Sequence, residues 1–183
     1  LPAEPDWLTQ VHGTAVRLQW DTAPLEADAA IAREPGTTVA VLTADCLTIL
    51  LCADSGEEIA AIHAGWRGLA TGIVDSTLAN MLTPPGRLLA WFGPAISQSA
   101  FEVGDEVRAA FVAGDAGAEA CFQSNERGRW QAVLYALAGS HIDAAGVRAV
   151  LGGGMCYVVD KERFFSYRRD GQCGRMPTFL HRP

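Results

Sequence analysis

The stretch Leu42–Leu69, which reads LTADCLTILLCADSGEEIAAIHAGWRGL, constrains the fold of this chain more than any other. Thr48–Ala53 is almost continuously apolar and predicts a buried strand, which ends at the turn signal Asp54–Gly56. Ile59–Ile62 is short and apolar enough to be the return strand. The stretch therefore predicts a β-hairpin that leads into a helix.

The predicted hairpin brings two chemically active side chains together. If the chain turns near Asp54–Gly56, opposed residues have numbers that sum to about 109–111. Cys46 and His63 satisfy this condition, so a thiol and an imidazole should meet at the open end of the hairpin. A bulge would shift the register by one residue, so the pattern predicts proximity and not contact geometry.

Length and charge exclude several classes of protein. The 183 residues suit one domain with a core that needs no disulfides or metals, and 49% hydrophobic residues indicate an ordered globular chain. The net charge of −7 and the pI near 5.0 argue against nucleic acid or an anionic membrane as a partner. No apolar run reaches the roughly 18 residues that a membrane-spanning helix needs.

The cysteines indicate the compartment. They are odd in number and widely spaced, which does not predict a disulfide framework. They are Cys46, Cys52, Cys121, Cys156 and Cys173. We therefore expect a reducing compartment, the cytoplasm. The chain begins at Leu1 without a methionine, and Leu1–Asp6 does not resemble a signal peptide.

Hydrophobic periodicity predicts a mixed set of elements in one α+β domain, with mixed β-sheets flanked by helices. The predicted helices are Trp66–Leu82, Val103–Ala113 and Trp130–Ala145. The predicted strands outside the hairpin are Trp7–Val11, Thr14–Trp20, Thr38–Thr43, Leu88–Phe92, Val147–Leu151 and Cys156–Val159. Ala27–Ala32 is apolar but of unclear type, and Asp21–Glu26 and Gly114–Arg129 are predicted to be irregular connections.

Three residues are candidate metal ligands: His12, Cys46 and His63. A thiolate and two imidazoles suit zinc, and three protein ligands with a fourth position open are typical of a catalytic site. A single cysteine in an apolar run is more commonly a buried residue than a metal ligand, and a single histidine before glycine is more commonly a loop residue. The position of all three residues at strand ends favours a metal site. His141, in the last turn of a predicted helix, and His181, near the C-terminus, show no such pattern.

Arginines supply candidate anion ligands, because a guanidinium matches phosphate oxygens with two hydrogen bonds. They are Arg67, Arg168, Arg169 and Arg175, although an arginine in a loop is more commonly a surface or structural residue. Gly152–Gly154 resembles a phosphate cradle only superficially, since no phosphate-binding or dinucleotide-binding motif follows it.

Five segments, in order along the chain, resemble a known family. They are QVHGTAV (Gln10–Val16), TADCLTILL (Thr43–Leu51), AIHAGWRGL (Ala61–Leu69), GPAI with AFEVGDEV (Gly93–Ile96, Ala100–Val107) and FFSYRRDGQCGRM (Phe164–Met176). Together they resemble the polyphenol oxidase/laccase-domain family of YfiH-, YlmD- and FAMIN-like proteins. The resemblance covers most of the chain, so it implies a single YfiH-like domain over residues 1–183.

The resemblance implies that His12, Cys46 and His63 bind a catalytic zinc, or copper in its place. It also implies phosphorolysis of adenosine, inosine and methylthioadenosine, and deamination of adenosine. Purine nucleosides and phosphate would then be the partners. Related bacterial members are linked to peptidoglycan editing.

Three departures from the family pattern stand out. Family members begin several dozen residues earlier, with a Ser-Thr-Arg and Gly-Gly segment that helps to line the pocket, and this segment is expected to be missing here. Val133-Leu134 replaces an Asp-Leu or Asp-Ile pair, and Cys156-Tyr157 replaces Cys-Thr. The first departure bears on full activity, while the other two should be tolerated.

A mechanism follows from these expectations as a hypothesis. Zinc lowers the pKa of a water molecule toward about 7, which suits attack on C6 of adenosine. In phosphorolysis, Arg67 with Arg168 or Arg169 would direct phosphate to the ribose C1′. Asp45, beside the cysteine ligand, is the candidate for general base or for orienting a ligand. In an extended strand, neighbouring side chains point to opposite faces, so the Asp45 side chain would point away from that of Cys46. This argues against the role of orienting the ligand.

Three alternatives stay open. Cys46 could be the nucleophile and His63 the base of a metal-free cysteine hydrolase that acts on an amide such as a peptidoglycan precursor. A multicopper oxidase is excluded because four histidines are too few for several copper ions, which leaves polyphenol oxidase-like activity at one copper ion. The third alternative is a zinc- or nucleoside-binding module without turnover.

Overall fold

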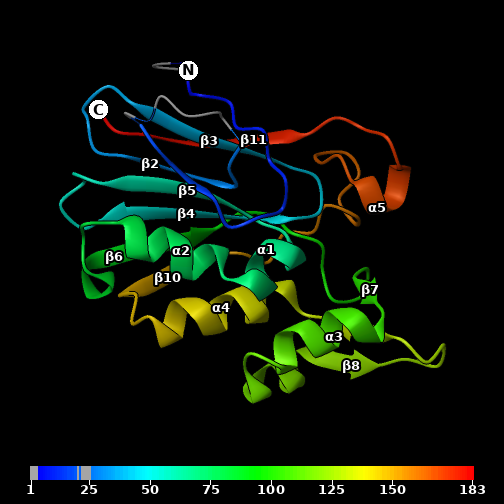
Figure 1. Ribbon diagram of the computed structural model, residues 1–183. Coiled ribbons are helices and arrows are strands. Elements are labelled where there is room, and N and C mark those ends of the chain that lie inside the picture. The colour runs from blue at the N-terminus through cyan, green and yellow to red at the C-terminus, as the bar shows by residue number, and fades with distance from the viewer. Residues whose placement is uncertain (1–3, 20, 22–25) are drawn as a thin grey trace.

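The protein is a layered α+β domain, seen here in a computed structural model that describes residues 4–19, 21 and 26–183. Figure 1 shows a small two-stranded sheet on one face of the main sheet and the helices α1, α2 and α4 on the other face. A third group, which contains α3, β7 and β8, lies beside the helices at one end of the molecule. The α+β class predicted from the sequence is confirmed.

The main sheet has six strands in the order β1-β2-β5-β4-β6-β10. They are β1 (Val16–Leu18), β2 (Ala29–Ala32), β4 (Leu47–Ala53), β5 (Ile59–Ala64), β6 (Leu88–Phe92) and β10 (Ala149–Gly152). The outer pairs β1–β2 and β6–β10 are parallel, and the inner pairs are antiparallel. The centre of the main sheet is therefore antiparallel, and it includes the predicted hairpin of β4 and β5.

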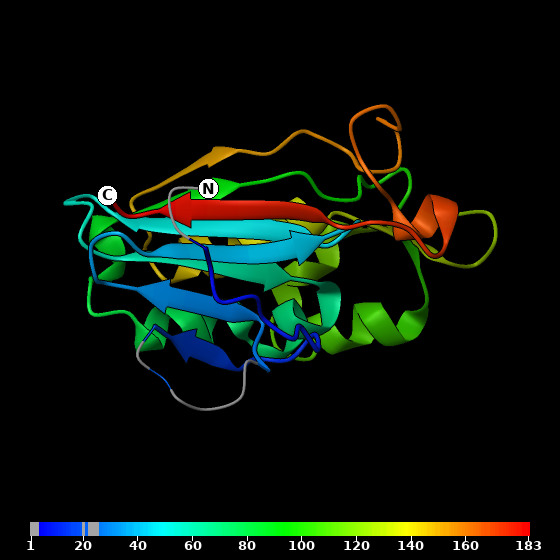
Figure 2. The same cartoon turned by 90° about the horizontal axis from the view of Figure 1, so that it is seen from above.

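Two smaller sheets complete the fold. β3 (Thr38–Thr43) pairs antiparallel with β11 (Met176–His181), and Figure 2, seen from above, shows this pair lying over the main sheet. β7 (Glu102–Val103), β9 (Trp130–Ala132) and β8 (Phe122–Ser124) form the third sheet, in this order. Because β11 lies beside β3, the C-terminal segment that precedes it passes close to the end of β3.

Three helices cover one face of the main sheet: α1 (Trp66–Thr71), α2 (Ile73–Asn80) and α4 (Leu134–Ala144). The helix α3 (Asp105–Val112) belongs to the group with β7 and β8, and the short helix α5 (Tyr167–Asp170) lies in the segment before β11. There are 3₁₀ turns at Pro85–Arg87 and Ala116–Cys121. The larger core lies between the sheet and the helices, where Ile49, Ile73 and Leu137 are fully buried. A second core lies under β3 and β11 and includes Val41 and Ala61.

Several predicted elements are confirmed. The hairpin forms with Leu47 opposite Ala64 and Thr48 opposite His63, at the upper end of the expected register. The strands over Thr38–Thr43 and Leu88–Phe92 have the predicted bounds. The apolar segment Ala27–Ala32 contains β2, and Thr14–Trp20 contains β1. Trp20 and most of the predicted connection Asp21–Glu26 lie outside the described residues.

All three predicted helices are wrong in extent. Trp66–Leu82 is divided into α1 and α2 at Gly72, whose φ of 97° is left-handed and ends the first helix. Trp130–Ala145 begins as the strand β9, because its first residues pair with β7 and β8, and only Leu134–Ala144 is helical. Similarly, Val103–Ala113 contributes Val103 to β7, and α3 covers Asp105–Val112.

The predicted strands near the two ends need larger corrections. Trp7–Val11 is not a strand: Thr9 forms an isolated bridge, and the Gln10 side chain exchanges two hydrogen bonds with the Leu42 backbone in place of a ladder. Cys156–Val159 is a series of turns, because Gly152, Gly153 and Gly154 all have positive φ and lead the chain out of the sheet. Conversely, β11 was not predicted, and His181 lies in it with its Nδ1 3.0 Å from Thr38 Oγ1.

Within the described part of the chain, no helix has the length and apolar character needed to cross a membrane.

Candidate metal centre

Cys46 lies at a sharp bend between two strands. β3 ends at Thr43 and β4 begins at Leu47, and between them Asp45 has a φ of 97°. Such a left-handed conformation is uncommon for a residue with a side chain, although aspartate tolerates it better than most. The Asp45 carbonyl accepts a hydrogen bond from the Ile96 amide at 2.8 Å, which helps to fix the bend.

His63 lies on β5, opposite Thr48 of β4. The register therefore places Cys46 beyond the last ladder pair and beside Gly65, near the imidazole of His63 but not directly opposite it. His63 is only 3% exposed, and its Nδ1 lies 2.7 Å from the Asp28 carboxylate. A carboxylate at Nδ1 favours a proton on that nitrogen and leaves Nε2 with a lone pair for a metal.

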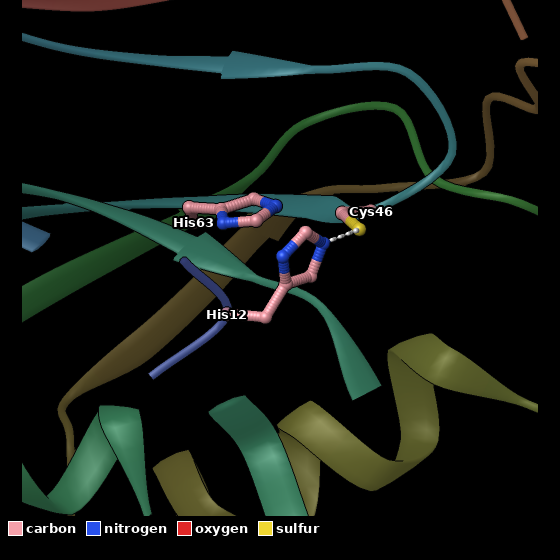
Figure 3. Close-up of side chains that lie close together, drawn as sticks. All are labelled: His12, Cys46 and His63. Atoms are coloured by element: carbon pink, nitrogen blue, oxygen red, sulfur yellow. Dashed lines mark hydrogen bonds between the residues drawn. The ribbon is translucent and has the colours of Figure 1, made fainter. Parts of the chain in front are cut away.

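His12 reaches the same place from the loop before β1. Its φ of 62° is left-handed, and its backbone N–H donates to Asp28 Oδ1 at 2.9 Å. Figure 3 shows His12, on its blue loop, and Cys46 joined by the hydrogen-bond contact between Nε2 and Sγ, which measures 3.9 Å. The His12 and His63 rings meet edge to face with centroids 4.7 Å apart.

Asp28 is the residue that organises this centre. Its side chain is fully buried and accepts hydrogen bonds from the backbone N–H groups of Val11, His12 and Gly13 as well as from His63. Burial alone would raise the pKa of Asp28, but the hydrogen bonds from His63, Gly13 and His12 lower it. One carboxylate therefore fixes both histidines.

Sequence reasoning missed Asp28. The available signal was an ionisable residue directly before the alanine-rich strand Ala29–Ala32, since aspartate is rarely buried without partners. That signal shows that Asp28 needs partners, but it does not show which ones, because they come from a different part of the chain.

The donor atoms fit a metal ion. One ligand atom from each of His12, Cys46 and His63 lies within 4.8 Å of the others. Tetrahedral zinc, with Zn–S near 2.3 Å and Zn–N near 2.0–2.1 Å, would separate sulfur and nitrogen by about 3.6 Å. The observed distance of 3.9 Å between Cys46 Sγ and His12 Nε2 is close to this value.

Gly65 makes room for the ligands. A Cβ at this position would lie 2.9 Å from His12 Cδ2, a distance that real Cβ atoms essentially never show, and 3.0 Å from Cys46 Sγ, which is tighter than most real Cβ contacts. Glycine is therefore required at residue 65 by the close approach of two ligand side chains, and the same residue precedes α1.

Without metal, the centre favours a thiolate on Cys46 and a second proton on His63, and a bound metal would take the place of that proton at Nε2. Burial opposes both shifts, but hydrogen bonds and charge from His12 and His63 lower the pKa of Cys46 to about 7. Likewise, Asp28 and Cys46 raise the pKa of His63 to about 9 in spite of its burial. A thiolate is the form of cysteine that binds metals and attacks electrophiles.

The centre opens into a cavity of about 560 Å³, which is within the size range of small-molecule sites. Its wall includes the three candidate ligands and Gln10, Asp45, Trp66, Arg67, Ile96, Phe101, Leu134, Tyr167, Arg168 and Arg175. Metal ligands, guanidinium groups and aromatic rings thus share one cavity. Phe101 and Tyr167 are further wall residues that the sequence did not single out.

Three of the four predicted anion ligands line the cavity, and one does not. Arg67 lies over the Trp66 ring, 4.5 Å from its centroid, and makes no hydrogen bond to any described residue. Arg168 and Arg175 also reach the cavity. Arg169 does not line it: its guanidinium donates to the carbonyls of Tyr157, Val158 and Phe164. Gly152–Gly154 and His141 lie outside the cavity wall as well.

The structure is a single α+β domain that places two histidines and a cysteine, which could hold a metal ion, beside an arginine-lined cavity. The family follows from comparison with known proteins. Residues 1–182 match the family described as multi-copper polyphenol oxidoreductase laccase, and the chain belongs to this family. The resemblance seen in the sequence motifs is confirmed.

Relatives of known name share close to half of their residues with this chain. Purine nucleoside phosphorylase YfiH of Escherichia coli is 47% identical over 182 residues, which cover 98% of this chain and 74% of the relative. A purine nucleoside phosphorylase of Pseudomonas aeruginosa is 46% identical over 181 residues, with 98% and 75% covered. The match thus extends over nearly all of this chain and about three quarters of each relative.

Solved structures show the same fold. A Neisseria meningitidis protein superposes with a TM-score of 0.90 at 43% identity, over 94% of this chain and 72% of that protein. YlmD from Geobacillus stearothermophilus superposes with a TM-score of 0.83 at 26% identity, over 96% and 72%. The YfiH-like fold expected from the sequence is therefore confirmed.

Proposed function

We propose that this protein is a zinc-dependent purine nucleoside phosphorylase that also deaminates adenosine and accepts methylthioadenosine. The observation that carries the proposal is the joint placement of the His12, Cys46 and His63 donor atoms and the Arg67 and Arg168 side chains in one cavity wall. The printed names of the relatives from Escherichia coli and Pseudomonas aeruginosa support the choice of reaction.

The donor chemistry favours zinc over copper. Two histidines and a cysteine also occur in blue-copper sites, but those sites add a weak axial ligand, commonly a methionine. Glutamine is an alternative axial ligand. Among the described residues, no methionine lines this cavity, and both side-chain polar atoms of Gln10 in its wall are hydrogen-bonded to the Leu42 backbone. A catalytic zinc with an open position needs only three protein ligands, which these residues provide. Zinc bound there would act as a Lewis acid and would lower the pKa of water.

In phosphorolysis, an oxygen of phosphate attacks C1′ of the ribose, the C1′–N9 bond breaks, and the purine leaves with a proton. Arg67 would bind the phosphate, because its guanidinium rests on the Trp66 ring and has no competing partner among the described residues. The wall residues Ile96, Phe101 and Leu134 supply apolar surface for the purine. We place the enzyme in the cytoplasm, in keeping with its five unpaired cysteines.

The test is incubation of the zinc-loaded protein with adenosine, inosine or methylthioadenosine, with and without phosphate, followed by chromatography. We expect the free base and ribose 1-phosphate (methylthioribose 1-phosphate from the last substrate) only when phosphate is present, and inosine from adenosine in either case. His12→Ala, Cys46→Ala and His63→Ala should lose bound metal and turnover together. Full metal loading without any of these products would contradict the proposal.

A second function is favoured by one observation. Cys46, His63 and Asp28 form a nucleophile, a base and an orienting carboxylate, the order found in cysteine hydrolases. This arrangement would serve an amidase, and a peptidoglycan precursor is the amide substrate we propose to test. Hydrolysis that survives chelation and is abolished by iodoacetamide would establish this second function, whereas loss of activity on chelation supports the zinc enzyme. Oxidation of a phenol by the copper-loaded protein tests polyphenol oxidase-like activity.

A further inference from the structure

The Asp45 carboxylate is fully engaged with the C-terminal segment, which lies far away in sequence. Its Oδ1 accepts a hydrogen bond from the Ser166 hydroxyl at 2.7 Å, and its Oδ2 accepts one from the Arg168 backbone N–H at 2.6 Å. Ser166 is fully buried. Both oxygens of Asp45 are thus occupied by the chain that enters α5, although Asp45 itself sits next to the cysteine ligand.

Ser166 extends this contact into a chain of hydrogen bonds. While its hydroxyl donates to Asp45, the same oxygen accepts from the Arg169 backbone N–H at 3.1 Å and caps the short helix α5. A serine hydroxyl can donate one hydrogen bond and accept others, so both contacts are satisfied at once. Asp45 therefore fixes the first turn of α5 through two of its residues.

The Arg169 side chain connects this segment to the preceding turns by hydrogen bonds to backbone carbonyls. Its Nη1 donates to the Tyr157 and Val158 carbonyls at 3.0 and 3.1 Å, and its Nη2 donates to the Phe164 carbonyl at 3.0 Å. It also pairs with the neighbouring carboxylate of Asp170 at 2.6 Å. These contacts give Arg169 a structural role, because they join α5 to the turns at residues 157–164.

The segment brings Tyr167, Arg168 and Arg175 to the cavity wall. Arg168 Nη1 donates to the Ala100 and Glu102 carbonyls at 3.2 and 3.0 Å, and the guanidinium lies 5.7 Å from the Phe101 ring centroid. No described residue accepts from its Nε or Nη2. Arg168 therefore has a fixed position and spare donors, which suits it to bind an anion.

We propose that Asp45 is a positioning residue, and that its hydrogen bonds to Ser166 and Arg168 hold the segment from Ser166 to Arg175 so that the Arg168 guanidinium faces bound phosphate. This inference rests on the proposed phosphorolysis and identifies its anion subsite. It replaces the general-base role considered for Asp45, because a carboxylate with both oxygens engaged by the protein is poorly placed to accept a substrate proton.

The first test does not depend on activity. Trypsin cleaves after arginine, and a segment released from Asp45 would expose the bonds after Arg168 and Arg169. Asp45→Asn and the milder Ser166→Ala should each increase the rate of cleavage there by about tenfold, the effect of one lost charge-assisted hydrogen bond on the open population. Asp75→Asn, the same chemical change on α2 outside the cavity, should leave the rate unchanged. Wild-type rates in both variants would overturn the proposal.

The second test measures phosphate directly. Isothermal titration of the zinc-loaded protein with inorganic phosphate should show binding that is about tenfold weaker in Asp45→Asn and Ser166→Ala, with bound zinc unchanged. In the turnover assay, the KM for phosphate should rise while the KM for inosine stays the same, a split that general loss of structure would not give. Faster cleavage with unchanged phosphate affinity would overturn the role of the segment in phosphate binding.

The two proposals fail in different ways. Absence of phosphate binding by the wild-type protein would overturn the anion subsite. Phosphate binding that weakens in the two variants, without any nucleoside turnover by the wild-type protein, would retain the subsite and refute the phosphorylase.

Discussion

At the scale of single residues, Asp28 positions two of the three candidate metal ligands through its hydrogen bonds to His63 and to the His12 backbone. Asp28→Asn keeps the size of the side chain but presents N–H groups to the Val11–Gly13 amides, which are themselves donors. We expect metal affinity to fall about 10- to 100-fold, the usual effect of losing a residue that orients a ligand. Competition with a chromophoric chelator measures this change.

Asp75→Asn is the matched control for that experiment. Asp75 also contacts a histidine Nδ1, that of His141 at 3.1 Å, but both residues lie outside the cavity with the metal ligands. The metal affinity of Asp75→Asn should equal that of the wild-type protein. If Asp28→Asn also bound metal with wild-type affinity, the candidate ligands would hold their positions without Asp28.

Gly65 should be intolerant of even one methyl group. In Gly65→Ala, the new Cβ would overlap His12 Cδ2 and Cys46 Sγ, and neither is the end of a long flexible side chain. We expect metal affinity to fall at least about tenfold while the hairpin strands stay paired. The control is Gly139→Ala in α4, where a Cβ meets nothing within 4 Å. Retained affinity in Gly65→Ala would mean that the loop of His12 moves freely.

At this scale, the sequence predicted that His12, Cys46 and His63 lie together, but it did not predict the residues that position them. Cys46 and His63 could be predicted because a hairpin register is a local property of the chain. Asp28 and Ser166 could not, because their partners are determined by how distant segments pack. For Asp45, sequence position suggested chemistry at the metal, whereas its carboxylate faces the α5 segment.

At the scale of elements, Gly72 separates α1 from α2. Its φ of 97° is unfavourable for any residue with a Cβ, so Gly72→Ala should lower the free energy of unfolding by about 1–2 kcal/mol. Gly139→Ala, in a regular helix, should instead raise it by about 0.5–1 kcal/mol. Chemical denaturation of both variants measures the difference. If Gly72→Ala were as stable as Gly139→Ala, the break between the helices would have another cause.

Glu58 holds the end of α2 against the hairpin. Its carboxylate is almost fully buried, pairs with Arg33, and accepts from the backbone N–H groups of Leu82 and Thr83. Burial would raise its pKa, but these hydrogen bonds lower it below the ordinary 4.5. Because the folded pKa is the lower one, Glu58 contributes stability above pH 4.5, and the contribution is lost as the pH falls through the folded value.

Glu58→Gln tests this contribution. At neutral pH, we expect the variant to be less stable than the wild-type protein by about 1–3 kcal/mol, and the difference should shrink as Glu58 becomes protonated in acid. The free energy of unfolding is measured at several pH values in the presence of a chelator, so that loss of metal does not contribute. A difference that is independent of pH would assign the effect to packing.

The predicted elements differ in accuracy for a physical reason. Thr38–Thr43 and Leu88–Phe92 were located correctly because continuous apolar runs between turn residues are a local signal. Trp130–Ala132 has a helical pattern but is a strand, since it pairs with β7 and β8 on both sides. β11 carries Pro177, which weakens the strand signal, and it forms because β3 offers an edge.

At the scale of the whole molecule, metal removal should change which cysteines react. Without metal, Cys46 has a pKa of about 7, so its thiolate fraction and its alkylation by iodoacetamide should rise steeply as the pH passes through this value. Burial raises the pKa of Cys52 and Cys121, so both should react later. Peptide mapping by mass spectrometry after brief alkylation gives the order.

Loading with zinc provides the comparison that separates the two proposed functions. Zinc bound by Cys46 should slow its alkylation by at least about tenfold and leave the slower cysteines unchanged, because a metal-bound thiolate is a poorer nucleophile than a free one. The protected protein should be the one that splits nucleosides. If zinc gives no protection and alkylation alone abolishes turnover, Cys46 acts as a nucleophile, and its arrangement with His63 and Asp28 serves hydrolysis without metal.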